Sequence, residues 1–436
     1  MTGMDLDTMK KAASRSSGRT LTGLLVLFQA TAMLLLTFKI EYTLNLQSLI
    51  LAAAMPAVSL LLLKGLPKVW NIDRVMLTMV LFLCSVSIVT LTATMKTSSA
   101  PLTQVIYIGV GLVAMIIGIA FIRKLKYWKR WIVPLMLFSL VFIALPLVIG
   151  DWKNGAKNWI GIERNGETLI SIQPSEFVKV TLMFVLAGFL SERQSRAKTF
   201  AAVVFGALLC VILLLERDLG ALVLYFLTTI ILYFLATSNL LITAAGLCAG
   251  CMGAVCAYFM FDYVKTRLAI WQNPWLDPEV SGYQIIQALV AIGSGGASGM
   301  GLGLGLARDI PLYYSDFIYA AICEEFGFVF ALLLLAVYVI IIMRGISIAM
   351  SARTSFHALL SFGIVAILGL QTLLIVGGNI RLIPLTGVVL PFIASGGSSM
   401  VSYLGATGLL LGISSLNADA DQEDIERAEW RDGRLV

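Results

Sequence analysis

Residues 219–261 read LGALVLYFLTTIILYFLATSNLLITAAGLCAGCMGAVCAYFMF, a run of 43 residues without a charged side chain. A helix needs about 20 apolar residues to cross a hydrocarbon core of roughly 30 Å. The run is therefore long enough for two spans, and Thr237, Ser238 and Asn239 supply the polar break between them. The pattern predicts two helices that cross a bilayer one after the other.

The rest of the 436-residue chain has the same character, with 59% hydrophobic and 13% charged residues. An ordinary soluble domain carries about 25% charged residues, so a single water-soluble globule is excluded. This much apolar surface also excludes a disordered chain. We expect an all-α integral membrane protein, a polytopic bundle of about 12 transmembrane helices. The predicted spans lie near residues 20–38, 46–63, 75–95, 103–122, 131–150, 173–190, 199–215, 219–236, 240–261, 316–343, 356–377 and 386–414.

Lys and Arg residues mark the sidedness of such a bundle because cationic loops resist translocation. One set of alternating loops, which includes both termini, holds 20 of the 31 cations, the opposite set holds ten, and Lys179 falls inside a span. We therefore expect both termini in the cytoplasm and the loops 151–172 and 262–315 outside the cytoplasmic membrane. This sidedness accounts for the net charge of +6 without a nucleic-acid partner. The predicted organisation is a basic cytoplasmic tail at 1–19, a transmembrane domain at 20–416 and an acidic cytoplasmic tail at 417–436, disordered from Asp419.

Signatures of nucleotide hydrolysis and of metal binding are missing from the sequence. There is no GxxxxGK[ST] segment, so the energy for any reaction has to come from the substrate or from an ion gradient. Cys248, Cys251 and Cys256 have CxxC spacing but lie in the charge-free run, without a nearby His or carboxylate, which favours packing over a metal site. No other metal-ligand set and no Ser/His/Asp set is visible, so we expect no metal held by side chains.

The outer loop at 262–315 contains an amphipathic segment followed by a glycine-rich one. Residues 282–292, GYQIIQALVAI, predict a short amphipathic helix with Gln284 and Gln287 three apart on one face. Residues 293–305, GSGGASGMGLGLG, contain seven glycines. Glycine permits exposed amides that can hold a phosphate, but it also suits a flexible lid, and the glycines alone favour the lid.

The last predicted span is irregular, because residues 383–400, IPLTGVVLPFIASGGSSM, contain two prolines and three glycines. Non-helical backbone survives at membrane depth only where it is buried in protein or lines a polar cavity. We expect a broken or re-entrant helix that faces the interior of the bundle.

Four ionisable residues fall at membrane depth, where a charged group costs several kcal/mol. Glu176 and Lys179 lie three apart on one helix face, and Glu324 and Glu325 fall near the middle of the bilayer. Such groups either form a structural ion pair that fixes packing or belong to a functional site. For Glu324 and Glu325 the two interpretations stand level, whereas Glu176 and Lys179 favour function.

Asp316 lies at the outer mouth of a predicted span, in YYSDF at 313–317, directly after the glycine-rich run. A carboxylate near a helix N-terminus is often a simple cap, which is the default interpretation of Asp316 taken alone. Asp218, in ERD at 216–218, occupies a matching outer corner and is predicted to be a cap.

Five blocks, taken together, resemble the SEDS family (shape, elongation, division and sporulation), which includes RodA and FtsW. In the family's order they are residues 158–160 with QPSEFVK at 173–179, DLG at 218–220, Arg267 with DPEVSGYQIIQALVAIGSGG at 277–296 and GMGLG at 299–303, IPLYYSDFIYAAICEEFG at 310–327, and Gly378 and Asn379 with PLTGVVLPFIASGGSS at 384–399. The resemblance covers about residues 155–415. It implies a ten-helix bundle, so two of the 12 predicted helices, near the N-terminus, are extra.

The resemblance implies a peptidoglycan glycosyltransferase for cell shape or cell division. Such an enzyme polymerises the lipid-linked disaccharide lipid II at the outer face of the cytoplasmic membrane, with a class B penicillin-binding protein as partner. Asp316 matches the aspartate of the family's TDFIF segment, its essential carboxylate, and we expect it to act as general base.

We further expect Lys179, Arg267 and the glycine-rich run to stabilise the diphosphate, with Glu176 holding Lys179. A divalent cation, Mg²⁺ or Mn²⁺, can accompany the diphosphate without a dedicated protein cage. The substrate-binding residues expected are Glu176, Lys179, Arg267, Gln284, Gln287 and Ser398.

Two other functions stay open. Twelve spans, buried charges and a broken helix also suit a flippase or transporter of the lipid-linked precursor. A non-catalytic scaffold for the penicillin-binding protein is suggested by departures from the family's pattern: ERDLG replaces QPDLG at 216–220, Ala288 replaces Ser, residues 310–312 replace LPE and Asn158 replaces Arg.

Overall fold

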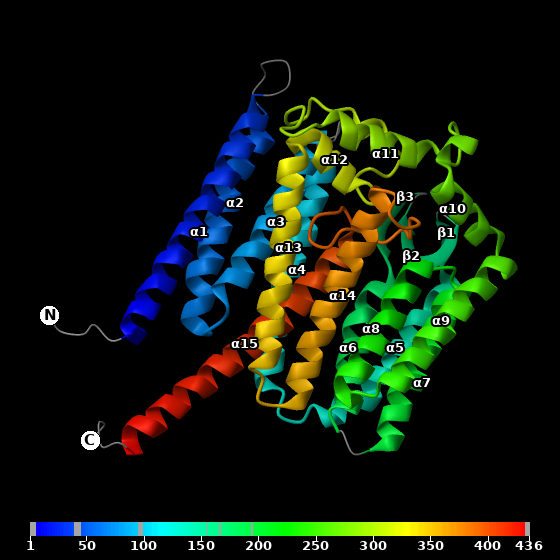
Figure 1. The fold of residues 1–436 in the computed structure, drawn as a ribbon. Helices are drawn as coiled ribbons and strands as arrows, with labels where there is room; N and C mark the ends of the chain where they lie inside the picture. The colour runs from blue at the N-terminus through cyan, green and yellow to red at the C-terminus, as the bar shows by residue number, and fades with distance from the viewer. Residues whose placement is uncertain are drawn as a thin grey trace.

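The computed structural model describes residues 6–38, 45–94, 99–153, 155–164, 167–192 and 195–431. It is a bundle of long helices in which the two ends of the chain lie on one side and α10, α11, α12 and the strands lie on the other (Figure 1). The distribution of Lys and Arg assigns the side with the termini to the cytoplasm. We call the opposite end of the bundle the outer end.

Eleven helices among the described residues are long and apolar enough to cross a membrane. A further helix, α6 (Pro174–Leu190), has 17 residues, packs against α5, α7, α8, α14 and α15, and occupies the position of the span predicted at 173–190. The eleven are α1 (Leu6–Thr37), α2 (Leu46–Val69), α3 (Arg74–Thr94), α4 (Ser99–Lys124), α5 (Lys129–Ile149), α7 (Arg196–Leu215), α8 (Leu219–Thr237), α9 (Leu240–Met260), α13 (Phe328–Met350), α14 (Ser355–Asn379) and α15 (Gly397–Arg431).

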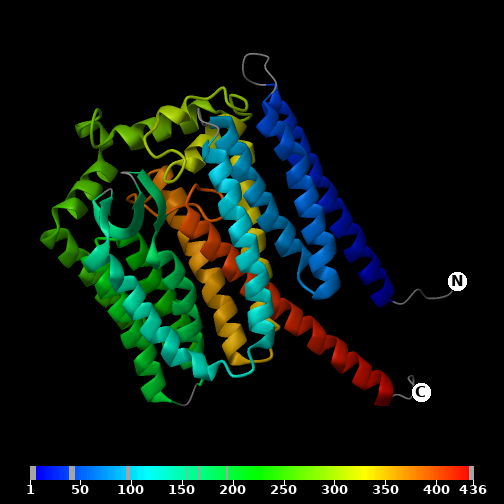
Figure 2. The ribbon, with the colours of Figure 1, turned by 180° about the vertical axis from the view of Figure 1, so that it is seen from behind.

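Small residues bring the helices close together, as is usual where lipid removes the hydrophobic drive for helix association. α4 and α15 pack side by side over most of their shared length (Figure 2). A Cβ atom on Gly118 of α4 would lie 2.8 Å from the carbonyl oxygen of Gly405 in α15. The two backbones can approach this closely only because glycine stands at the crossing.

The extra N-terminal helices α1 and α2 form a hairpin at the edge of the bundle (Figure 2). Gln29 of α1 donates to the hydroxyls of Ser59 in α2 at 2.8 Å and of Ser85 in α3 at 2.7 Å. A hydrogen-bonded amide at this depth fixes the hairpin against α3 because an unpaired polar group is costly in lipid.

The span predicted at 316–343 is broken. α12 (Ile318–Phe326) ends at Gly327, whose φ of 86° lies in the left-handed region, and α13 starts at Phe328. A Cβ on Gly327 would lie 2.5 Å from the carbonyl oxygen of Ala297, because the glycine-rich run packs against this junction. Only glycine fits such a close approach with this backbone conformation.

The outer loops are more structured than the sequence suggested. The segment predicted as a loop at 151–172 forms an antiparallel sheet in the order β1-β2-β3, with strands β1 (Asp151–Lys153), β2 (Ala156–Arg164) and β3 (Glu167–Ile172). The predicted amphipathic helix at 282–292 is confirmed as α11 (Tyr283–Ser294). The second loop also contains α10 (Asp262–Gln272), η1 (Pro274–Leu276) and η2 (Ala307–Asp309).

The irregular last span is confirmed, since residues 380–396 are not helical and α15 begins only at Gly397. Disorder from Asp419 was the wrong expectation, because α15 continues without a break to Arg431. Arg123 holds Asp419 at 2.7 Å, and Arg353 pairs with Asp424. These ion pairs fix the acidic end of the helix against cytoplasmic cations. Residues 1–5 of the basic tail and 432–436 of the acidic tail lie outside the described residues.

Candidate active site at the outer end of the bundle

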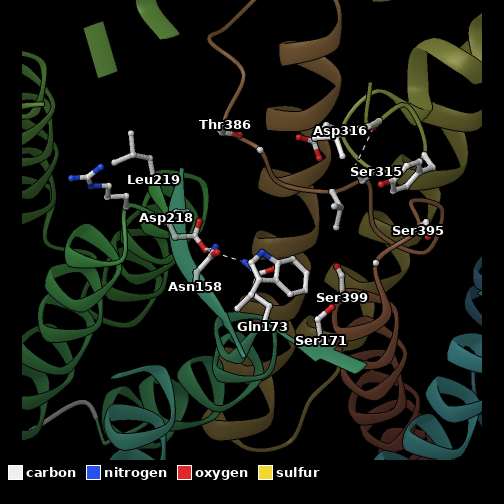
Figure 3. Close-up of a pocket in the computed structure, with 18 of the residues that line it drawn as sticks. Asn158, Ser171, Gln173, Asp218, Leu219, Ser315, Asp316, Thr386, Ser395 and Ser399 are labelled. Carbon is white, nitrogen blue, oxygen red and sulfur yellow. Dashed lines mark hydrogen bonds between the residues drawn. The ribbon is translucent and has the colours of Figure 1, made fainter. Parts of the chain in front are cut away.

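A pocket of about 330 Å³ opens between the outer sheet, the turn before α8, α10 and the non-helical segment before α15. Figure 3 shows Asp218 and Asn158 at one side of it and Asp316 with Ser315 across from them. Its walls are rich in polar and charged groups. They are formed by Ala156, Asn158, Trp159, Ser171, Gln173, Arg217, Asp218, Leu219, Arg267, Leu312, Tyr314, Ser315, Asp316, Thr386, Gly387, Val389, Ser395, Gly396 and Ser399.

Asp316 reaches this pocket through a tight turn in front of α12. Leu312 adopts the left-handed conformation with φ of 59°, and its carbonyl accepts from the Asp316 N–H at 3.0 Å. Asn379 of α14 donates to the Asp316 carbonyl at 2.7 Å, which ties the turn to the core. The N-cap of α12 is Phe317, so the Asp316 carboxylate lines the pocket and the interpretation of Asp316 as a simple cap does not hold.

Burial raises the pKa of Asp316 to about 6, although a hydrogen bond from Ser315 and the charge of Arg267 both act to lower it. A carboxyl group with such a pKa is mostly ionised at neutral pH but holds a proton more readily than an exposed aspartate. This is the range in which a carboxylate works as a general base.

Arg267 comes from the outer helix α10 and crosses to the non-helical segment. It donates to the carbonyls of Leu385 and Thr386, at 3.4 and 3.2 Å. The structure thus brings Arg267 and Asp316 into one pocket, as their predicted roles require.

Asp218 organises the opposite wall. It caps α8 as predicted, accepting from the Ala221 N–H at 3.0 Å. Its other oxygen accepts from Asn158 at 2.7 Å and from Gln173 at 3.0 Å. The sequence predicted only the cap. The contacts with Asn158 and with Gln173, in the QPS turn at 173–175, join segments 60 and 45 residues apart in the chain.

Glu176 and Lys179 lie below the pocket rather than in its wall. Their charged atoms are 2.5 Å apart, and Lys179 also donates to Gln371 at 3.0 Å and lies 4.3 Å from the centre of the Tyr403 ring. The Lys179 side chain is only 4% exposed. A second cavity of about 20 Å³, lined by both residues, adjoins the main pocket and shares Gln173, Asp218, Gly387 and Val389 with it. The pair therefore supports the floor from beneath.

The remaining predicted binding residues lie outside the pocket wall. Gln284 and Gln287 belong to α11, which packs on α12. Ser398 is buried, and its hydroxyl accepts from the Gln173 N–H at 3.1 Å, so it holds the QPS turn in place.

The glycine-rich run does not reach the pocket, contrary to a phosphate-holding role. Three of its backbone amides donate to α12: those of Met300 and Gly301 to the Glu324 and Glu325 carbonyls, at 2.8 and 3.1 Å, and that of Gly303 to the Glu325 carboxylate. The Glu324 carboxylate accepts from Ala307 at 2.6 Å. The two buried glutamates thus receive backbone donors from the glycine-rich segment, which gives them a structural role in holding the loop.

Several polar atoms of the pocket are buried without a hydrogen-bond partner among the described residues. They are Asn158 Oδ1, Thr386 Oγ1 and Ser399 Oγ. Buried polar atoms left unpaired point to a ligand or water that satisfies them. Within the described ranges, no three His, Cys, Asp or Glu side chains form a group that could hold a metal. The arrangement suits a polar ligand rich in hydroxyls, amides and negative charge.

The chain is similar to known proteins over most of its length. A sequence model of the FtsW/RodA/SpoVE family, described as a cell cycle protein, matches residues 68–418. The stage V sporulation protein E of Bacillus subtilis is 35% identical over 71% of this chain and 86% of its own length. The peptidoglycan glycosyltransferase RodA of Mycobacterium tuberculosis is 33% identical over 71% of this chain and 69% of its own length.

A solved structure of a peptidoglycan synthase complex, described as coordinating polymerization and crosslinking, contains a similar chain. Its TM-score is 0.68 at 24% identity, and the match covers 79% of this chain and 98% of that one. This likeness shows the fold. The helices α1 and most of α2 precede the family region.

Proposed function

Because the chain belongs to the FtsW/RodA/SpoVE family, we propose that it is a peptidoglycan glycosyltransferase of the cytoplasmic membrane, the activity named for its RodA relatives. Its substrate is lipid II, a disaccharide joined to a polyprenyl chain through a diphosphate. The reaction takes place at the outer end of the bundle, where the pocket lies.

The observation that carries this proposal is the Asp316 carboxylate in the pocket wall, in the same cavity as Arg267. The carboxylate takes the proton from the 4-hydroxyl of the acceptor sugar while that oxygen bonds to the anomeric carbon of the donor. The bond from that carbon to the diphosphate breaks, and the diphosphate leaves with the electron pair. Arg267 stabilises the charge that develops on the leaving group.

Glu176 and Lys179 serve this reaction from below. A buried ion pair is strongly destabilising when one partner is removed, because the other charge is then left alone. The pair fixes α6 and its QPS turn against Gln371 and Tyr403 of α14 and α15. In this proposal they hold the pocket floor, and Ser398 holds the turn itself.

We also propose a class B penicillin-binding protein as partner, since the solved neighbour comes from a complex that couples polymerization to crosslinking.

The test is polymer formation from purified protein in detergent, alone and with candidate partners, after incubation with lipid II. Glycan chains on a gel are the expected product, because a flippase or scaffold forms none. Asp316→Asn should abolish the product, whereas Asp309→Asn, at an exposed site in the same outer loop, should leave it unchanged. Normal polymerisation by the Asp316→Asn protein would refute the assignment.

A further inference from the structure

Three groups were expected to hold the diphosphate, and the structure removes two of them from the pocket. Lys179 is bound to Glu176, Gln371 and the ring of Tyr403 beneath the floor. The glycine-rich run does not line the pocket, and its Met300, Gly301 and Gly303 amides donate to α12. Of the expected cations, only Arg267 lies in the wall, and one arginine is a weak match for a group with two phosphoryl units.

A second guanidinium in the wall is that of Arg217, in the turn between α7 and α8. Its backbone has φ of 61°, in the left-handed region that residues other than glycine rarely adopt. Such strain costs about 1–3 kcal/mol and persists where the surrounding structure enforces it, often at functional sites. The turn places the guanidinium 5.7 Å from the centre of the Tyr263 ring.

Tyr263 links the two arginines. It lies four residues before Arg267 on α10, so the two side chains share one face of that helix. The Tyr263 hydroxyl is buried and has no hydrogen-bond partner among the described residues. Burial also raises the pKa of this hydroxyl, which keeps it protonated and able to donate.

We propose that Arg217 and Arg267, with the Tyr263 ring against Arg217, form a binding site for the diphosphate of a polyprenyl-linked substrate, with Arg217 as the cation that replaces Lys179 in this role. The two guanidinium groups each face one phosphoryl unit, since their planar forks match phosphate oxygens in pairs. The Tyr263 ring, which does not line the pocket itself, lies against the Arg217 guanidinium. This inference rests on the proposed function, because it places the leaving group of that reaction.

The negatively charged Asp218, which also lines the pocket, is compatible with this arrangement. Asp218 directs its oxygens to Asn158, Gln173 and the Ala221 N–H. Its carboxylate lines the same pocket, but both of its oxygens already accept hydrogen bonds, which offset its negative charge. A phospholipid headgroup at the membrane surface offers the same phosphate chemistry, and the test has to separate the two sources.

The test uses the purified full-length protein in detergent and measures binding of a polyprenyl diphosphate, with the matching monophosphate and phosphatidylglycerol as separate probes. Arg217→Gly suits the left-handed backbone, so the variant should fold at least as well as the parent. We expect it to weaken diphosphate binding by roughly 10- to 100-fold, the range for one lost charge-assisted hydrogen bond. Arg217→Lys should retain part of the affinity, and the monophosphate should respond less.

Arg381→Gly is the matched control. Arg381 also has left-handed backbone, with φ of 59°, lies at the same outer end and does not line the pocket. It should bind the diphosphate like the parent. Equal affinity of the Arg217→Gly variant and the parent would overturn the site, as would an equal loss in both glycine variants. Binding of phosphatidylglycerol that depends on Arg217, without such binding of the diphosphate, would assign the arginine to phospholipid instead.

Polymerisation of lipid II by the same preparations separates this inference from the proposed function. Diphosphate binding that depends on Arg217 in a protein that forms no glycan would sustain the site and contradict the enzyme. Glycan formation with an unchanged KM in the Arg217→Gly variant would sustain the enzyme and contradict the site. A raised KM with a smaller change in kcat is the result expected if both are correct.

Discussion

Replacing Asp316 by Asn should stabilise the protein while it removes the activity. The folded protein raises the pKa of this carboxyl from 3.8 to about 6 by burial. A raised carboxyl pKa means that the folded state resists ionisation, so stability is lost as the pH rises from about 4 to 6 and stays lower above that range. Asparagine has the same shape and no charge, so the Asp316→Asn protein does not lose this stability as the pH rises.

The size of the effect follows from the shift. About two pKa units at ~1.36 kcal/mol each give an upper limit of about 3 kcal/mol at pH 7.5. Asp316 is partly exposed to the pocket, so solvent screening reduces the expected gain to about 1–2 kcal/mol. For a chain of this size that corresponds to a rise in melting temperature of about 1–4 °C.

Thermal unfolding in detergent, followed at several pH values, measures the gain. The difference between Asp316→Asn and the parent should be largest at pH 7.5 and fall to about one third at pH 4.5, where the folded parent is protonated. Asp309→Asn serves as the control, because the Asp309 side chain is exposed and its charge is not buried. A melting temperature of Asp316→Asn equal to that of the parent at pH 7.5, or an increase independent of pH, would refute the reasoning.

Three further outcomes are expected. The kcat/KM for polymerisation should fall about tenfold per pH unit below pH 6, as Asp316 takes up its proton. Arg267→Gln should move the midpoint to higher pH, because it removes the positive charge that lowers the pKa of Asp316. A profile flat from pH 5 to 8 would contradict this. Gly327→Ala should lower stability by ~2 kcal/mol or more in a thermal melt, since the residue has φ of 86° and a close backbone neighbour. The control is Gly293→Ala, which has open space around the new Cβ and should be neutral or slightly stabilising. Glu324→Ala should release the glycine-rich run and speed its proteolysis. Glu324→Gln should be cleaved at an intermediate rate, because the amide keeps one acceptor oxygen. Equal cleavage rates in the parent and both variants would show that the carboxylate does not hold the loop.

The transmembrane architecture was predictable because it depends on local properties of the chain. A lipid core demands an apolar run of a certain length, and cations mark the side that stays in the cytoplasm. The pair of Glu176 and Lys179 was visible for the same reason, since residues three apart on a helix face meet without help from the rest of the fold. The re-entrant segment before α15 followed from its prolines and glycines.

The site itself was only partly predictable. Asp316 and Arg267 were expected there and line the pocket. Arg217 had no predicted role, because the sequence of the three-residue turn at 216–218 does not reveal that its backbone is left-handed or where its side chain points. The ion pairs of the acidic end of α15 join segments about 70 and 300 residues apart in the chain, and no local pattern reveals them.

The amino-acid sequence by itself therefore determined which segments cross the membrane, which end faces outward and which residues carry charge at depth. Tertiary structure alone decided which of those charges line the outer pocket. Lys179 is removed from the pocket by Gln371 and Tyr403, and the glycine-rich run is bound by α12. Hydrogen-bond partners distant in the chain compete with a ligand for the same donors, and only the packing of helices shows which donors are already taken.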